Sequence, residues 1–342
     1  MKKHVVAFMV FLSFSGGMVF SAGQGGSAGG ARPVTIKLAS LVPETSPWGA
    51  ALNKMAGNVK AETNGAVDII VYHGGVAGGE ADVLRKLKVN QIQAAILTSF
   101  GLNEITPEVL ALSCPFLIRS EAELDYVLEK LKPVLEENIN RSGFQTIAWS
   151  KVGFVSFFSK VPARTPAEMK KLKVGTSDTE TTLLNVFKSM GYQLVPQSMN
   201  QALIDLNTDR VEAVYQEPLS AASFQLFAIT KYMMNFPIAP FMGGIFMNQT
   251  AWRTIPEQHQ RVVLKHAKVA EKEIETQLDD LRKTAIDMMV QNGLVIYDLT
   301  PEEQAMWIAD AEAGVPRLVG STFDADIYRR VTEILKEYRS QK

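Results

Sequence analysis

The sequence is poor in the residues that most often carry catalysis, metal binding or covalent cross-links. It has one cysteine, Cys114, and four histidines among 342 residues. One cysteine cannot form an internal disulfide, and the apolar neighbours of Cys114 indicate a buried structural thiol rather than a nucleophile. His259 and His266 are seven residues apart, too far for the metal pair that a four-residue helical spacing gives, and no His-Glu-x-x-His or Cys-x-x-Cys motif occurs. We therefore expect no catalytic residues, no metal and no cofactor.

The charge is balanced, which argues against a nucleic-acid partner. Lysine and arginine total 35, aspartate and glutamate total 36, and no long block of one sign occurs. Apolar residues make up 46% and charged residues 21%, an ordinary globular composition. A chain of this length suits two domains of about 150 residues each.

The only long apolar run is at the N-terminus. Lys2 and Lys3 precede residues 5–19, which are almost all apolar, and the small residues Ser21 and Ala22 follow. This layout predicts a secretory signal peptide over residues 1–22, followed by a Gly/Ser-rich tether over residues 23–33. The run is short for a membrane span, although an uncleaved anchor is the alternative. We expect a periplasmic protein that does not span the membrane when mature.

The rest of the chain alternates strand and helix patterns. Helix starts are expected at Ser46-Pro47 and at Thr300, whose Glu303 completes a capping box. Residues 257–292 lack proline and glycine, so they predict one helix of about 54 Å, long enough to brace two lobes. Strands are expected over residues 34–42, 67–71, 92–97, 144–149, 154–159, 172–176, 192–195 and 211–215, and helices also over 121–140, 180–190, 201–207 and 325–339. Two successive β-α-β-α-β runs predict two α/β lobes, with ligands bound outside the carboxyl ends of the strands.

Short fragments along the chain carry a resemblance to a known family. They are Ile36-Lys37-Leu38-Ala39, Ser46-Pro47-Trp48-Gly49, Gly74-Gly75-Val76, Gly79-Glu80, Asp82-Val83-Leu84-Arg85-Lys86, Pro115-Phe116-Leu117, residues 153–160, Thr165-Pro166-Ala167-Glu168-Met169-Lys170, Leu206-Asn207, Val211-Glu212-Ala213-Val214 and Glu217-Pro218. In this order and spacing the chain resembles the solute-binding P subunits of TRAP (tripartite ATP-independent periplasmic) transporters, the dicarboxylate-binding-protein (DctP-like) family.

The resemblance implies the fold and its division. It implies a two-lobed α/β clamp of the periplasmic-binding-protein type, with mixed sheets flanked by helices, hinge strands, and a long helix that spans both lobes. We place lobe I at residues 34–150 plus 240–275 and lobe II at residues 151–239 plus 276–342, with the ligand cleft between them.

The resemblance also implies the function and partners. The chain is expected to capture a small molecule and deliver it to TRAP membrane permease subunits. A ligand-sensing role with a tetratricopeptide-repeat accessory subunit is an alternative. No motif favours a third class, an enzyme.

The sequence departs from the family where organic acids bind. Family members that bind acids carry an arginine after the Thr-Pro-…-Lys-Leu-Lys segment, and Gly175 stands at that position here. A second arginine often follows the Gly-Phe pair, where this chain has Val155. Glycine cannot replace a bidentate arginine, so we expect a neutral, apolar or amphipathic solute rather than a simple dicarboxylate. The alternative is an organic acid bound through Lys173 or Lys151.

Further cleft residues are expected at the strand ends. Glu217 stands where many relatives have asparagine, and its carboxylate would repel an anion. The aromatic and methionine side chains of this set could instead belong to the core. The remaining candidates are Leu41, Trp48, Thr98, Ser99, Phe100, Phe154, Thr176, Met199, Tyr215 and Gln216.

Overall fold

The computed structural model describes residues 33–341, except 178–180 and 198. The predicted signal peptide and all but the last residue of the predicted tether lie outside the described residues. The strands are β1 Val34–Ala39, β2 Val67–Tyr72, β3 Ala94–Thr98, β4 Phe144–Ser159, β5 Lys173–Ser177, β6 Gln193–Gln197, β7 Ala213–Gln216, β8 Tyr232–Met234, β9 Ala239–Asn248 and β10 Val295–Tyr297.

Helices lie between most of these strands, as the alternating pattern predicts. They are α1 Pro47–Glu62, α2 Glu80–Lys88, α3 Ser99–Asn103, α4 Glu121–Arg141, α5 Pro166–Met169, α6 Thr181–Ser189, α7 Met199–Asn207, α8 Pro218–Ser223, α9 Gln249–Trp252, α10 Glu257–Gln291, α11 Pro301–Gly314 and α12 Ala325–Ser340. Short 3₁₀ helices over Pro107–Ser113, Leu226–Ala228 and Val315–Leu318 were not predicted.

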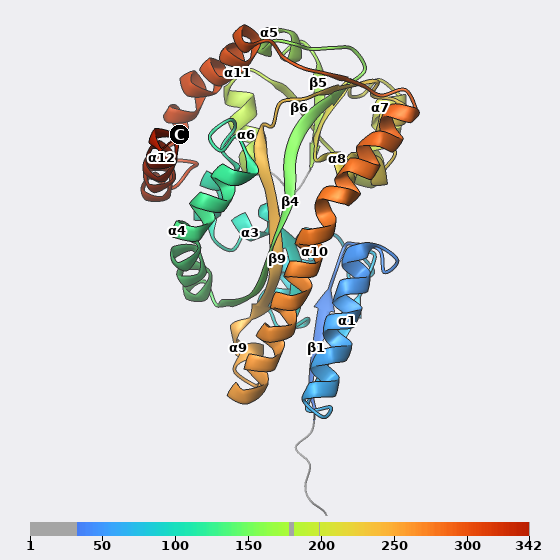
Figure 1. Ribbon diagram of the computed structural model, residues 1–342, viewed down its shortest axis with the longest axis vertical. Coiled ribbons are helices and arrows are strands. Elements are labelled where there is room, and N and C mark those ends of the chain that lie inside the picture. Colours follow the sequence, from blue (N-terminus) through green and yellow to red (C-terminus); the bar gives the residue numbers. More distant parts are fainter. Residues whose placement is uncertain (1–32, 178–180, 198, 342) are drawn as a thin grey trace, which may run out of the picture. The chain divides into compact units, whose positions relative to one another are not determined.

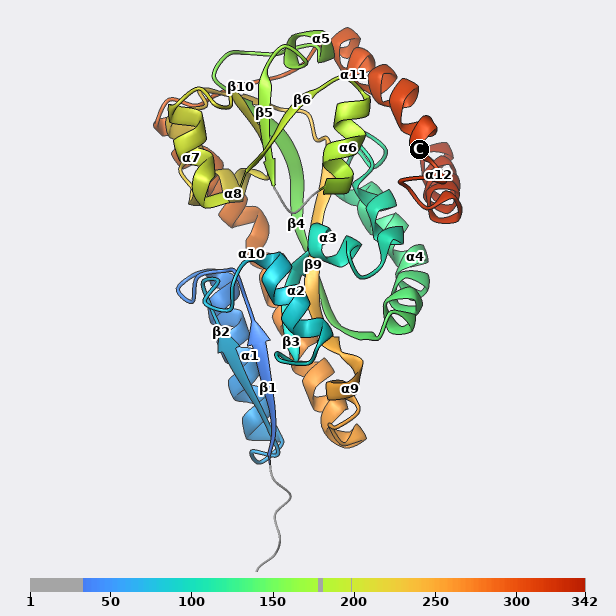
Figure 2. The ribbon, with the colours of Figure 1, turned by 180° about the vertical axis from the view of Figure 1, so that it is seen from behind.

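The strands form a mixed sheet in the order β2-β1-β3-β9-β4-β7-β5-β6, and β8 pairs with β4 and β10. β1 runs parallel to β2 and β3, while β5 runs parallel to β6 and β7. The antiparallel strands β9 and β4 join these two parallel groups (Figure 2). This arrangement confirms the α/β class with mixed sheets, and it leaves two separate sets of parallel carboxyl ends at which side chains can gather.

One strand prediction was wrong in an instructive way. We expected separate strands over residues 144–149 and 154–159, but β4 is continuous over 16 residues. It pairs with β9 from Phe144 to Val155 and absorbs register shifts between Thr146 and Ala148 and between Lys151 and Gly153. Gly153 has φ 143°, a conformation that glycine adopts freely. The glycine therefore bends the strand without ending it.

The predicted helix starts are confirmed. The Ser46 hydroxyl accepts from the Gly49 amide at 3.1 Å, and Pro47 occupies the first turn. Thr300 and Glu303 form the reciprocal capping box that opens α11. These local signals could be identified because capping depends on a few neighbouring residues rather than on distant packing.

The long helix is also confirmed, at 35 residues. It packs against α1 near its start, against β4 along its length and against α8 near its end (Figure 1). Val263 and Ala267 lie in a core with β1 and α1, whereas Ala285 and Met289 lie in a core with Phe158 of β4. The helix thus contributes to the packing of both parallel groups.

Candidate functional site

The candidate residues at the carboxyl ends of the first parallel group differ in exposure and in hydrogen bonding. Leu41, just past β1, is 39% exposed, and Trp48 of α1 is half-buried. At the end of β3, Ser99 donates from Oγ to the Met242 carbonyl at 3.0 Å. The backbone of Phe100 begins α3, and its side chain lies outside the described part of the structure.

Glu80 is a residue of this edge that the sequence analysis did not single out as a site residue. Its carboxylate accepts from the Thr98 amide at 2.5 Å and from the Thr98 hydroxyl at 2.9 Å. Burial raises the pKa of Glu80, and the hydrogen bonds from Thr98 and the Gly101 amide oppose that shift. A β-carbon at position 101 would lie 2.5 Å from Glu80 Oε1, so the glycine there leaves room for the carboxylate. Glu80 thus fixes the strand end with both oxygens occupied.

The second parallel group contains the most informative pair, Gly175 and Gln197. Gly175 lies in β5 and pairs with Val195 of β6. Gln197 comes two residues after Val195 in β6, so its side chain is on the same face of the sheet as position 175. A β-carbon at position 175 would lie 2.2 Å from Gln197 Nε2 and 2.7 Å from its Cδ. The carboxamide of Gln197 therefore occupies the space directly over Gly175, where a longer side chain would begin.

Gln197 combines burial with an unused acceptor. Its side chain is only 6% exposed, and Oε1 has no hydrogen-bond partner among the described residues. Sequence reasoning missed Gln197, because the register between β5 and β6 is needed to place its side chain over Gly175. The sequence signal available was a glycine inside a predicted strand, which often marks a close approach.

Glu217 is the second buried acceptor at this edge. It directly follows β7, caps α8 through a 2.9 Å hydrogen bond from the Ser220 amide to Oε2, and is fully buried. Its Oε1 has no hydrogen-bond partner within the described part of the chain. Burial raises the pKa of Glu217 above its ordinary value of 4.5, and the helix amides and the positive charge of Arg282 oppose that shift.

The other predicted residues of this edge lie around the same strand ends. Thr176 is buried in β5, and Gln216 of β7 accepts through Oε1 from the Glu217 amide at 3.1 Å. Val155 and Tyr215 belong to the large core beneath, where the Tyr215 ring contacts Phe157. The last two predicted residues are placed only in part: Phe154 is half-buried against the core of the first group, and Met199 begins α7 with a side chain outside the description.

Three elements, α4, β4 and α10, meet near position 152. Arg282 of α10 donates from Nη2 to the Val152 carbonyl at 3.1 Å, and its guanidinium lies 3.6 Å from Glu121 of α4. Lys151 forms ion pairs with Asp125 and, at 3.9 Å, with Glu275. The predicted lobe boundaries at 150/151 and 275/276 thus fall on residues that are in contact.

Neither lysine of the alternative hypothesis lies at a parallel carboxyl end. The Lys151 amine is taken by Asp125 and Glu275. Lys173 is exposed at the start of β5, about 7 Å along the strand from Gly175 and away from its carboxyl end. Neither lysine therefore lies beside Gly175 at the carboxyl end of β5.

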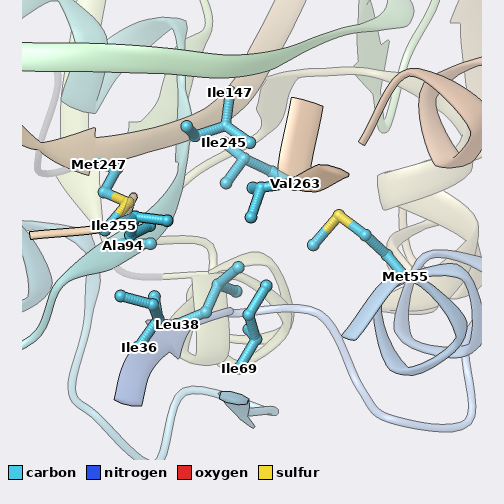
Figure 3. A pocket seen from close by; sticks show the side chains of 10 residues that line it. All are labelled: Ile36, Leu38, Met55, Ile69, Ala94, Ile147, Ile245, Met247, Ile255 and Val263. Carbon is cyan, nitrogen blue, oxygen red and sulfur yellow. The ribbon is translucent and has the colours of Figure 1, made fainter. Parts of the chain in front are cut away.

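Two hollows lie elsewhere in the protein. A cavity of about 10 Å³ has an entirely apolar lining that includes Ile36, Leu38 and Met55, and it has room for about one water molecule (Figure 3). A surface groove of about 320 Å³ runs between α4, β4 and α10. Its lining has five carboxylates (Asp125, Glu129, Glu136, Glu271 and Glu275) against two lysines (Lys132 and Lys151), so it does not suit an anion.

Residues 33–341, apart from the gaps named above, show neither a metal-binding cluster nor a membrane-spanning helix. In that region no cluster of three or more histidine, cysteine, aspartate or glutamate side chains could hold a metal ion. Across the same residues, no helix is both long and apolar enough to cross a bilayer. Cys114 is buried, as predicted, and burial raises the pKa of its thiol well above the ordinary value.

Comparison with known proteins shows a family match and several similar proteins. A family model described as bacterial extracellular solute-binding protein, family 7, matches residues 38–319. A solute-binding protein of Verminephrobacter eiseniae is 21% identical over 273 residues, covering 78% of this chain and 80% of its own. The C4-dicarboxylate-binding protein of Bacillus subtilis is 19% identical over 309 residues, covering 89% and 87%.

Solved structures show the same fold. A TRAP periplasmic solute-binding protein from Chromohalobacter salexigens, with bound D-glucuronate, superposes with a TM-score of 0.81 at 18% identity, covering 88% of this chain and 99% of its own. A TRAP periplasmic solute-binding protein from Desulfovibrio salexigens, with bound orotic acid, gives a TM-score of 0.80 at 17% identity, covering 90% and 99%.

Proposed function

Since the chain belongs to the bacterial extracellular solute-binding protein family 7, which includes the solute-binding proteins of TRAP transporters, we propose that it is a periplasmic receptor for a solute other than a simple organic acid. It delivers that solute to a TRAP membrane permease and catalyses no reaction. Residues 1–22 serve as its signal peptide. The solute lies between lobe I (residues 34–150 and 240–275) and lobe II (151–239 and 276–342), against the carboxyl ends of both parallel groups.

One observation carries the choice of solute. Gly175 stands where acid-binding relatives are expected to have arginine, and the carboxamide of Gln197 fills the space above it. The second expected arginine position, Val155, is 3% exposed and packs in the core. A buried carboxylate without a cationic partner is strongly disfavoured. The two solved structures described above contain carboxylic acids, D-glucuronate and orotic acid. Because this chain has neither expected arginine, a different ligand class is proposed for it.

The fully buried Glu217 also disfavours an acidic solute. A carboxylate at the end of β7 repels a second carboxylate and accepts hydrogen bonds. The solute that fits is neutral, with apolar or amphipathic character, because the nearby core faces are apolar and the polar groups at this edge include unused acceptors.

Matched pairs of solutes test this function. The purified mature chain is titrated calorimetrically with D-glucuronate, L-malate and orotate and with the corresponding primary amides, which differ only at the acid group. Binding of at least one amide, at least tenfold tighter than its acid, supports the proposal. Tighter binding of the acids contradicts the ligand class while leaving the receptor function intact.

A further inference from the structure

Two buried acceptor atoms at the carboxyl ends of β6 and β7 have no assigned role. They are Gln197 Oε1 and Glu217 Oε1, on side chains that are 6% exposed and fully buried, and neither has a hydrogen-bond partner among the described residues. Buried polar atoms in native proteins are nearly always paired, because an unpaired one is costly. Two such atoms at one sheet edge therefore point to donors that come from outside the described residues.

The sequence around Gln197 keeps its amide in this position. Gly175 has no β-carbon, and one there would approach Gln197 Nε2 to 2.2 Å. The amide can occupy this space over Gly175 only because position 175 has no β-carbon. Gly175 and Gln197 therefore act as one unit, in which the smaller residue makes room for the polar group of the larger.

The two side chains indicate the kind of donor. The positive charge of Arg282 already acts on the Glu217 carboxylate, and its Oε2 accepts from the Ser220 amide. Oε1 is therefore the atom of Glu217 that is left to accept a hydrogen bond. Gln197 is uncharged and presents a carbonyl oxygen, so it also favours a neutral N–H or O–H donor over an anion.

We propose that the solute is uncharged and donates N–H or O–H hydrogen bonds to Gln197 and Glu217, and that Gln197 is the residue that selects for the donor. This inference rests on the proposed receptor function and narrows its ligand class. A carboxylate is rejected because it would face two acceptors, and a solute without donors is rejected because it would leave both acceptors buried and unpaired.

The test separates the donor from the rest of the solute. D-glucuronamide, L-malamide and orotamide are titrated into the purified chain beside their N,N-dimethylamides, which keep the carbonyl and lose the amide N–H. The wild-type chain is expected to bind at least one primary amide about tenfold tighter than its dimethylamide, the effect of one well-placed hydrogen bond.

Variants of β6 then assign the donor contact to Gln197. Gln197→Leu keeps the approximate size of the side chain and removes the carbonyl, so the preference for the primary amide should fall to about twofold or less. The control is Gln193→Leu at the other end of the same strand, where the amide is exposed and donates to the Lys170 carbonyl at 3.0 Å. This control should keep the tenfold preference.

A second variant keeps the inference testable if Gln197→Leu does not fold. Gly175→Ala pushes the flexible end of Gln197 aside and leaves the amide in the chain, so it should also reduce the preference while the variant remains folded. A preference that survives in both variants, or binding of no amide, overturns the inference. Equal binding of primary amides and dimethylamides by the wild-type chain, with the acids weaker, overturns the amide N–H as the donor, because the hydroxyl and ring N–H donors remain in both series. Tighter binding of the acids also contradicts the proposed ligand class.

Discussion

The guanidinium of Arg282 in α10 donates to the backbone carbonyl of Val152 in β4 at 3.1 Å. Gly153, the next residue, has φ 143°, and a β-carbon there would lie 2.9 Å from Arg282 Nη2. The strand bend, the long helix and the arginine therefore meet at one point. That point is where the chain crosses between the two parallel groups, so its rigidity should affect the whole fold.

Replacement of Arg282 by methionine should lower the free energy of unfolding by about 2 kcal/mol. The change removes a charge-assisted hydrogen bond to Val152 and leaves the buried Glu217 with less positive charge nearby. Urea denaturation measures the difference. Arg261→Met is the matched control, since Arg261 lies on the same helix in an exposed ion pair and should cost less than about 0.5 kcal/mol. Equal losses in both variants would contradict a special role for Arg282.

The pH dependence of stability should report on Glu217. Its pKa is raised in the folded state, chiefly by burial, so the folded chain holds this proton more tightly than the unfolded chain. The resulting stability is fully present below the ordinary value of 4.5 and is lost as the pH rises through the folded-state pKa. Glu217→Gln lacks this loss, so its melting temperature relative to wild type should increase from about pH 4 to about pH 8. A difference that is constant with pH would show that Glu217 does not titrate in this way.

Trp307 should be the most costly single truncation in the core around β5 and β6. It is fully buried in α11, donates from Nε1 to the Arg164 carbonyl at 2.8 Å, and contacts the rings of Phe116 and Phe157. Trp307→Ala should lose about 3–5 kcal/mol in urea denaturation. The neighbouring Met306 is 51% exposed, so Met306→Ala should lose less than about 1 kcal/mol.

Lys151 should have no part in ligand binding. Its amine pairs with Asp125 and Glu275 in the groove beside α10. Lys151→Met should leave the affinity for the tightest-binding solute of the amide and acid panel within about twofold, and should cost about 0.5 kcal/mol of stability. A larger loss of affinity, measured by calorimetry, would revive the hypothesis that a lysine replaces the missing arginine.

Local sequence signals predicted much of the fold. The cap residues Ser46 and Thr300 and the uninterrupted stretch that forms α10 depend on neighbours along the chain, so the observed starts agree with those predicted. The continuity of β4 could not be predicted. It depends on pairing with β9, about a hundred residues later, which holds the strand together across Gly153.

The candidate site was less accessible to sequence reasoning. Gly175 and Glu217 were predicted from single positions, and their place at the ligand stays a prediction. Gln197 was not predicted, because the register of β5 against β6 is needed to place its side chain over Gly175. Val155 and Tyr215 were expected at the ligand and are in the core. A strand pattern shows which residues alternate, but it does not show which face packs inward at a strand end.

The central claim is that this receptor binds an uncharged solute at the edge formed by Gly175, Gln197 and Glu217. The most direct test is native mass spectrometry of the exported protein, purified without added solute, followed by denaturing extraction and identification of the retained compound. Our account predicts a neutral compound that carries N–H or O–H donors and that is lost from Gln197→Leu. A retained carboxylate, bound equally by the wild type and by Gln197→Leu, would contradict the account.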